Sequence, residues 1–183
     1  MSFSEEKLIK GCQKGERKYQ QALYDKFADG MYLVALRYSK MQQEAEDILQ
    51  ESFIKVFKNI QNFRKDSSLA YWIKRIVVNT ALNHQRSKLY LYPMVDVNDL
   101  NDWSDQEDVI ADLGYQELLV LIQELPAGCQ AIFNLFAIEG YKHHEIAKKL
   151  EISEGTSKSQ YSRAKSILVE KIMSQAHRRY GEI

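Results

Sequence analysis

The sequence predicts an all-α protein with two helical domains joined by an acidic linker. Apolar residues recur at spacings of three and four over most of the 183 residues, which is the period of amphipathic helices. Residues that interrupt helices are rare, since the chain has only 2 Pro and 8 Gly. Residues 1–95 contain 16 Lys and Arg against 10 Asp and Glu, residues 96–125 contain none against 9, and residues 126–183 contain 9 against 6. Two basic segments therefore flank an acidic one, although the formal net charge is zero.

The first domain is expected over residues 1–88. Four helices are predicted from the apolar periodicity, near residues 4–13, 18–39, 43–61 and 67–88. Each places its large apolar side chains on one face, so the four can share a single core.

Residues 89–107 interrupt this pattern and predict a linker, because Pro93, two asparagines and a group of aspartates replace the apolar repeat. The second domain is expected over residues 108–183. Periodicity resumes at Asp108 and continues to Leu125, and a further helix after Pro126 should end at Gly140, since glycine suits the first position after a helix.

The stretch EIAKKLEISEGTSKSQYSRAKSIL, residues 145–168, predicts a helix-turn-helix. Ser153 is a good N-cap residue, so a new helix should begin near Glu154. The residues expected on its inner stripe are Ser157, Tyr161, Ala164 and Leu168, facing Ile146, Ala147, Leu150 and Ile152. The residues expected on its outer face are Lys158, Ser159, Ser162, Arg163 and Lys165.

These donors on the outer face suit phosphates and base edges in a major groove. An ordinary helical hairpin with a solvated face explains the same stretch, and the stretch alone leaves DNA binding and this alternative equally open.

Two polar groups stand out in the first domain. Asp47, Gln50 and Glu51 fall on one exposed face of the third predicted helix, where a solvated acidic surface is the simpler interpretation. The segment that follows interleaves aromatic, cationic and amide side chains, the set that stacks and hydrogen-bonds single-stranded bases. Its residues are Phe63, Arg64, Lys65, Ser67 and Ser68 in a loop, and Tyr71, Trp72, Lys74, Arg75, Asn79, Asn83, His84 and Arg86 on a helix. Such a helix can bury one side and bind with the other.

At these residues the sequence resembles the extracytoplasmic-function group of bacterial sigma-70-type RNA polymerase sigma factors. EAEDILQESFIKVFKNIQNFRKDSSLAYWIKRIVVNTALNHQR is similar to the family's region 2, and LPAGCQAIFNLFAIEGYKHHEIAKKLEISEGTSKSQYSRAK is similar to region 4. No similarity to a region 1.1 or to an independent region 3 domain is visible, which fits this group.

The resemblance implies a role for each matched position. The residues implied to dock on the clamp helices of the polymerase β′ subunit are Asp47, Gln50 and Glu51. The residues implied to capture a flipped base of the minus-10 element or to lie by the melted strand are Phe63, Arg64, Lys65, Ser67, Ser68, Trp72, Ile76, Asn79 and Asn83. The residues implied to face the minus-35 element are Lys158, Ser159, Ser162 and Arg163, with Lys165 near phosphate.

The resemblance also implies that the linker threads through the active-site cleft of the polymerase, where its acidic side chains imitate nucleic acid. The acidic positions concerned are Asp96, Asp99, Asp102, Asp105 and Glu107. Three positions depart from the family's pattern: Ser157 replaces an aliphatic residue, Tyr161 replaces Leu or Ile, and Gln160 replaces a basic residue. These departures bear on the minus-35 sequence and on the packing of the recognition helix.

The expected partners are core RNA polymerase through its β and β′ subunits, promoter DNA and an anti-sigma protein, with no cofactor or metal. A stand-alone helix-turn-helix regulator is the alternative. Catalysis is disfavoured, because Lys148 stands where a zinc-protease helix needs its second His and no glycine-rich phosphate loop occurs.

No apolar run reaches the roughly 18 residues of a membrane span and no signal peptide is apparent, so a cytoplasmic protein is expected. The two cysteines, Cys12 and Cys129, are expected to be buried thiols.

Overall fold

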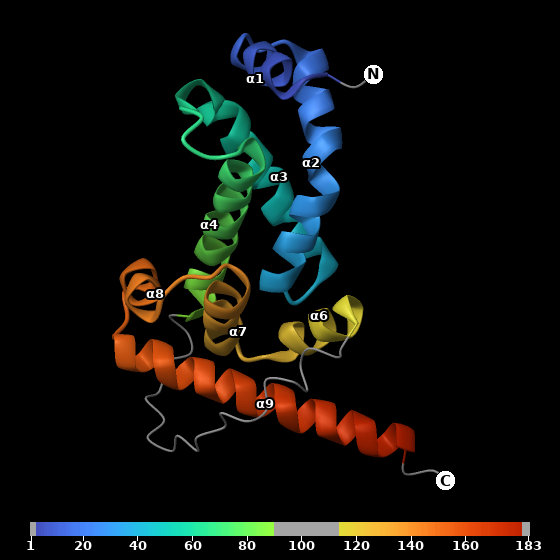
Figure 1. The fold of residues 1–183 in the computed structure, drawn as a ribbon, viewed down its shortest axis with the longest axis vertical. Helices are drawn as coiled ribbons and strands as arrows, with labels where there is room; N and C mark the ends of the chain where they lie inside the picture. The colour runs from blue at the N-terminus through green and yellow to red at the C-terminus, as the bar shows by residue number, and fades with distance from the viewer. Residues whose placement is uncertain (1–2, 90–113, 181–183) are drawn as a thin grey trace. The chain divides into compact units, whose positions relative to one another are not determined.

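Residues 3–89 and 114–180 are described by the computed structural model, and every regular element within these ranges is a helix (Figure 1). The all-α prediction is therefore confirmed for this part of the chain. The chain divides into two compact units, Met1–His84 and Gln85–Ile183, and each has buried apolar residues of its own. The predicted acidic linker, apart from its first residue Leu89, and the first residues of the predicted second domain lie outside the described residues.

The first unit begins with three helices that pack in sequence order (Figure 1). Helix α1, Glu5–Gln13, is capped by Ser4, whose hydroxyl accepts from the Lys7 N–H at 3.4 Å. The chain then turns at Gly15, whose φ of 73° lies in the left-handed region that favours glycine. Helix α2, Arg17–Tyr38, packs along α3, Gln42–Asn59.

The core of the first unit is formed by the predicted apolar stripes. Its buried side chains include Leu8, Leu23, Val34, Tyr38, Ile48, Phe53, Val56, Ile73 and Val77. The Tyr24 ring packs on the Phe53 ring at 4.7 Å between centroids. Cys12 and Cys129 are both buried free thiols, as the sequence predicts, and burial raises the pKa of Cys12 to about 11.

Helix α3 ends two residues earlier than its apolar pattern predicts. Residues Ile60–Asn62 tighten into a 3-10 turn, η1, and a loop at residues 63–68 leads into α4, Leu69–Leu89. Ser68 caps α4, because its hydroxyl accepts from the Tyr71 N–H at 3.2 Å. The turn and the cap hold both ends of this short polar loop.

The second unit contains α6, Tyr115–Glu124; α7, Ala127–Phe133; a π-helical segment η2, Asn134–Ile138; α8, His143–Leu150; and α9, Glu154–Tyr180. Helices α6 and α7 pack on the long α9 and enclose one apolar cluster. Its buried members are Leu121, Ile122, Leu125, Cys129, Phe133, Ala164, Leu168 and Ile172.

The helix expected between Pro126 and Gly140 changes its winding halfway. From Asn134 the hydrogen bonds become wider, with the Glu139 N–H donating to the Asn134 carbonyl at 2.9 Å. The segment stops at Gly140, whose φ of 77° agrees with the predicted helix end. Within the described ranges, no helix is long and apolar enough to cross a membrane.

Candidate nucleic-acid and polymerase interface

The turn between α8 and α9 has the geometry of a helix-turn-helix. Helix α8 ends at Leu150, and the φ of 59° and ψ of 43° of its C-cap, Glu151, are the left-handed conformation that terminates helices. Two residues later the Ser153 hydroxyl accepts from the Thr156 N–H at 2.8 Å, and α9 begins at Glu154. The predicted N-cap and helix start are confirmed.

The inner stripe of α9 packs partly on other helices than the sequence suggests. Ala164 and Leu168 are buried against α6 and α7, not against α8. Only the first part of the stripe lies by α8, where Ser157 bonds His143 at 2.9 Å. The reason is the length of α9, which extends well past the short α8 and meets the other helices of the unit.

The outer side of α9 carries three cations and a hydroxyl, hereafter the α9 surface: Lys158, Ser162, Arg163 and Lys165. Lys158 and Arg163 are exposed, and Ser162 and Lys165 are half-buried.

Two of these cations are held by neighbours on the same helix. Lys158 pairs with Glu154 one turn earlier at 2.8 Å, and this hydrogen bond lowers the pKa of the Glu154 carboxyl. The Lys165 ammonium lies over the Tyr161 ring, 5.3 Å from its centroid.

The structure does not place Ser159 on the exposed row with which it was grouped. Its side chain is 7% exposed, and its hydroxyl donates to the carbonyl oxygen of Thr156 at 3.1 Å. Three residues on a helix turn through about 300°, which returns Ser159 toward the buried side that Thr156 and Gln160 occupy. Gln160 is itself buried and accepts from the Cys129 thiol at 3.0 Å, which explains why a basic residue does not stand there.

Helix α4 presents one accessible face, formed by Trp72, Ile76, Asn79 and Asn83. Their spacings of four, three and four put them in line. Trp72 and Ile76 are half-buried and the two asparagines are exposed. We refer to this row together with the loop at residues 63–68 as the α4 surface.

The loop of the α4 surface is held at both ends by packing and hydrogen bonds, and its central side chains are exposed. Phe63 is buried and packs on Trp72 at 5.2 Å between ring centroids, which forms the aromatic base. Lys65 adopts a left-handed φ of 61°, unusual for a residue with a side chain, and its ammonium reaches Glu6 on α1 at 3.5 Å. Arg64 and Ser67 are exposed at the centre of the loop.

The acidic group on α3, hereafter the α3 face, divides into two parts. Asp47 and Gln50 are exposed. Glu51 is bonded by Lys55 at 2.7 Å and by His84 of α4 at 2.5 Å, and these bonds, Lys55 first, lower the pKa of its carboxyl. Glu51, Lys55 and His84 thus form a polar cluster between α3 and α4, hereafter the clasp, next to Asp47 and Gln50.

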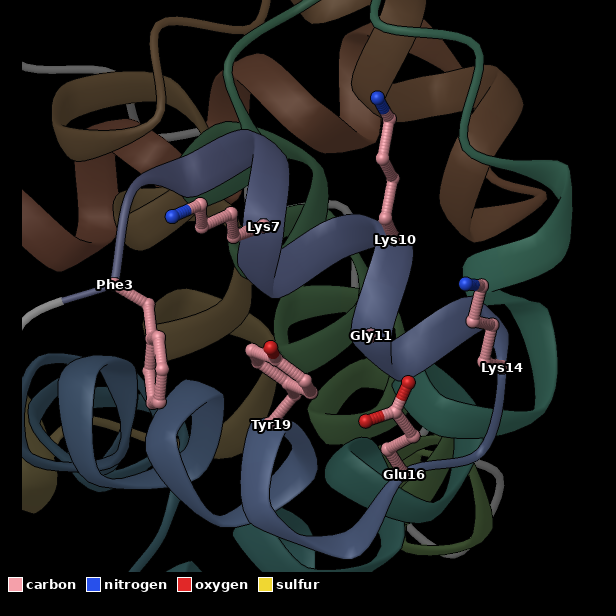
Figure 2. Close-up of a pocket in the computed structure, with 7 residues that line it drawn as sticks. All are labelled: Phe3, Lys7, Lys10, Gly11, Lys14, Glu16 and Tyr19. Carbon is pink, nitrogen blue, oxygen red and sulfur yellow. The ribbon is translucent and has the colours of Figure 1, made fainter.

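Sequence reasoning missed a hollow beside α1, the α1 hollow, of about 230 Å³. Figure 2 shows Lys7 and Lys10 on α1 and Lys14 just after its end, with the Phe3 and Tyr19 rings and Glu16 also lining the hollow. The two rings pack at 4.8 Å between centroids, and a β-carbon on Gly11 would collide with the Tyr19 ring. The spacing of three and four residues between the lysines can be read from the sequence. The pairing of the two rings cannot, because it depends on α2 packing back against α1.

Two segments of the sequence match models of one family. Residues 23–89 match sigma-70 region 2, and residues 115–168 match sigma-70 region 4, so together they span well over half of the chain. The α3 face and the α4 surface lie in the first segment, and the α9 surface lies in the second. The chain belongs to the sigma-70 family.

Relatives along the whole length place this sigma factor in the extracytoplasmic-function group. It is 27% identical over 176 residues to the RNA polymerase sigma-H factor of Pseudomonas aeruginosa, covering 90% of this chain and 91% of that one. It is 25% identical over 182 residues to the ECF RNA polymerase sigma-E factor of Escherichia coli K12, covering 93% and 95%. A sigma factor with both regions directs RNA polymerase to promoters and starts transcription there.

A solved structure has the same fold. The sigma factor RpoE from Bartonella quintana, crystallised with the anti-sigma factor NepR, aligns with a TM-score of 0.51 at 20% identity, covering 84% of this chain and 96% of that chain.

Proposed function

We propose that this sigma factor reads its promoter with two surfaces of different chemistry, while the α3 face joins it to core polymerase. The α9 surface reads duplex DNA at the minus-35 element, and the α4 surface holds the opened strand at the minus-10 element. The observation that carries the proposal is the position of both surfaces within matched family regions, each with its polar groups on an accessible side.

For the minus-35 element, α9 enters the major groove with Arg163 and Ser162 toward the base edges and Lys158 and Lys165 toward phosphates. The ion pair between Glu154 and Lys158 is exposed and therefore weak, so Lys158 can leave Glu154, or bond both groups, when a phosphate approaches. Ser159 is left out of the proposed contact set because its hydroxyl bonds Thr156.

For the minus-10 element, the open centre of the 63–68 loop receives a flipped base, with Arg64, Lys65, Ser67 and Ser68 around it. Flipping costs a few kcal/mol, which contacts with an aromatic ring and with amides can offset. Trp72, seated on Phe63, lies where the duplex opens. Ile76, Asn79 and Asn83 then line the path of the separated strand.

The α3 face docks on the polymerase β′ subunit through Asp47 and Gln50, with Glu51 holding the α3–α4 clasp behind them. Because Glu51 bonds His84 of α4 as well as Lys55, this carboxylate joins the helix of the docking face to the helix of the α4 surface.

We infer that the three lysines of the α1 hollow, which Glu16 also lines, attract the phosphates of a strand that leaves the 63–68 loop. Gln13 of α1 donates to the Ile60 carbonyl at 3.2 Å, and Lys65 of the loop reaches Glu6, so α1 and the loop form one body. The lysine row therefore continues the positive track for a strand that leaves the loop. Lys10→Glu should weaken binding of single-stranded minus-10 DNA. The matched control, Lys26→Glu on α2, should leave this binding unchanged.

We further propose that the protein acts in the cytoplasm, has no catalytic activity of its own and needs no cofactor. Its acidic segment at residues 89–107 occupies the polymerase cleft, and an anti-sigma protein restrains it, in keeping with the complex of the similar sigma factor RpoE with NepR. The domain boundaries at residues 1–88 and 108–183 belong to the same proposal.

Mixing the protein with core RNA polymerase and sequencing the transcripts tests this function. We expect start sites that share two sequence elements at a fixed spacing, and no tight duplex binding by the protein alone. Autonomous, sequence-specific duplex binding without polymerase would instead favour a stand-alone regulator.

A further inference from the structure

Three aromatic side chains and a hydroxyl meet where η2, α8 and α9 converge, and we call this group the ring joint: Phe136, His143, Ser157 and Tyr161. The His143 ring stacks on Phe136 with 4.2 Å between centroids and 15° between planes. The Tyr161 ring meets His143 edge-on at 5.8 Å and Phe136 at 4.5 Å. Nδ1 of His143 lies 2.9 Å from the Ser157 hydroxyl.

The ring joint contains the two aliphatic positions at which the sequence departs from the family pattern, Ser157 and Tyr161. A polar residue at a buried helix contact is costly unless it is hydrogen-bonded, and His143 supplies that bond to Ser157. Phe136 and His143 supply the ring surfaces that Tyr161 packs on. The departures are therefore matched by partners from two other segments.

The ring joint is connected to the α9 surface at both of its α9 residues. Ser157 directly precedes Lys158, and Tyr161 carries the Lys165 ammonium over its ring at 5.3 Å. A shift of the His143 ring would therefore act on the part of α9 that carries two of the cations that the proposed function assigns to DNA.

The surroundings of His143 favour its neutral form. Burial, and then the charge of Lys158, lower the pKa of the imidazole, while Glu154 acts in the opposite direction. On α8 itself, His143 occupies the first turn, where the helix dipole is positive, beside His144. The Glu145 carboxylate on that helix is turned back to accept from the Lys142 N–H at 2.8 Å, and η2 contributes the uncharged Phe136 ring.

We propose that His143 is a positioning residue that sets α9 for the minus-35 element only while its imidazole is neutral. The inference rests on the proposed function of the α9 surface. Protonation does not remove the bond to Ser157, since a hydroxyl can also accept. It places a second cation near Lys158 in a half-buried site, and the ring relieves both burial and this repulsion by moving toward solvent, away from its place between α8 and α9. Reading of the minus-35 element thus weakens as pH falls.

The test uses holoenzyme assembled from the full chain and core polymerase. Its affinity is measured at pH 7.5, 6.5 and 5.5 for two promoter fragments that differ only in having the minus-35 element intact or replaced. The ratio of the two affinities isolates reading by α9 and cancels the effects of pH on polymerase. We compare wild type with His143→Phe, which keeps a stacked ring without a titrating group, and with His144→Gln, a control at the exposed neighbour.

We expect the ratio to fall several-fold between pH 7.5 and 5.5 for wild type and for His144→Gln. The ratio should stay flat for His143→Phe. A wild-type ratio that is flat, or that rises at low pH because DNA phosphates favour the cation, overturns the inference while the proposed function stands. A ratio of one at every pH overturns the proposed function as well.

A second measurement does not depend on how His143→Phe folds or binds. The imidazole C–H signals of the full chain are followed by NMR between pH 4.5 and 8, with Ser157→Ala as the companion variant. We expect the His143 signal to titrate below 6.5, the ordinary value for histidine, and Ser157→Ala to lower the affinity ratio at pH 7.5 several-fold. Titration at or above the ordinary value, or an unchanged ratio in Ser157→Ala, contradicts the positioning role.

Discussion

The α9 surface and the α4 surface are both polar faces on helices, but their side chains are held differently. On α9 two of the three cations are held by neighbours on the same helix, Lys158 by Glu154 and Lys165 by the Tyr161 ring. On α4 the row consists of two amides, an isoleucine and a tryptophan that packs on a buried phenylalanine, and the cations of the α4 surface lie in the preceding loop, while Arg75 is exposed beside the row. Duplex DNA offers a regular row of phosphates, whereas an opened strand offers unstacked bases, and each surface has the groups that its target needs.

The largest expected effect comes from removing the packing beneath the α9 surface. Leu168 is fully buried in the cluster of α6, α7 and α9, so Leu168→Ala should lower the free energy of unfolding of the second unit by about 2–5 kcal/mol. Met173→Ala, at an exposed position on the same helix, should cost little. Thermal unfolding followed by circular dichroism measures both. Equal melting of the two variants would mean that α9 does not depend on this cluster.

An intermediate effect is expected when the α9 surface loses its exposed arginine. Arg163→Ala should weaken minus-35 binding by about 1–3 kcal/mol if the guanidinium reads a base, and should change discrimination between sequences at one position. Equilibrium binding of holoenzyme to a panel of minus-35 variants measures this, with Lys171→Ala farther along α9 as the control. A uniform loss over all sequences would assign Arg163 to phosphate, and no loss would remove it from the interface.

A comparable change on the α4 surface should act at a different step. Asn79→Ala should reduce formation of the open complex by about 1–3 kcal/mol, as expected for losing one base contact, and leave initial binding to closed duplex unchanged. Permanganate footprinting detects the unpaired thymines. Asn59→Ala supplies an amide deletion on α3 as the reference. Normal melting in Asn79→Ala would contradict a strand path along α4.

The smallest effect concerns the clasp behind the α3 face. The pKa of Glu51 is lowered in the folded state by the bonds from Lys55 and His84, so its stabilisation is present above the unfolded value and is lost as pH falls through the lowered one. Because the carboxylate is partly exposed, Glu51→Gln should cost no more than about 1 kcal/mol at pH 7.

Denaturant titrations of Glu51→Gln and wild type should therefore begin to converge near the ordinary glutamate pKa of about 4.3 and meet below the lowered pKa of Glu51. Asp47 is not one of the residues of the clasp, so Asp47→Ala should change the affinity for polymerase and leave the free energy of unfolding unchanged. A difference in stability that persists in acid would exclude the charge of Glu51 as its cause.

Much of the fold could be predicted because its signals are local. The Ser153 cap, the helix end at Gly140 and the loop at residues 63–68 each depend on residues within a few positions of one another. The family regions are similarly readable, since their motifs are continuous in sequence.

What could not be predicted depends on elements far apart in the chain. Glu51 looked like one of three solvated polar residues; Lys55 lies one turn along the same helix, but only the position of α4 shows that His84 also bonds it. Ser159 looked exposed because the buried side of α9 is wider than one stripe, a consequence of packing on three helices. The π-helical winding of η2, which brings Phe136 to His143, has no signature in the residue pattern.

The division of work between the two surfaces is tested most directly by giving holoenzyme a promoter whose minus-10 region is already unpaired by mismatched bases. The yield of stable complexes is compared for Asn79→Ala and Arg163→Ala on this template and on the matched duplex. We predict that pre-melting restores most of the loss in Asn79→Ala and none of the loss in Arg163→Ala. Equal rescue of both variants, or of neither, would contradict the assignment of strand opening to α4 and duplex reading to α9.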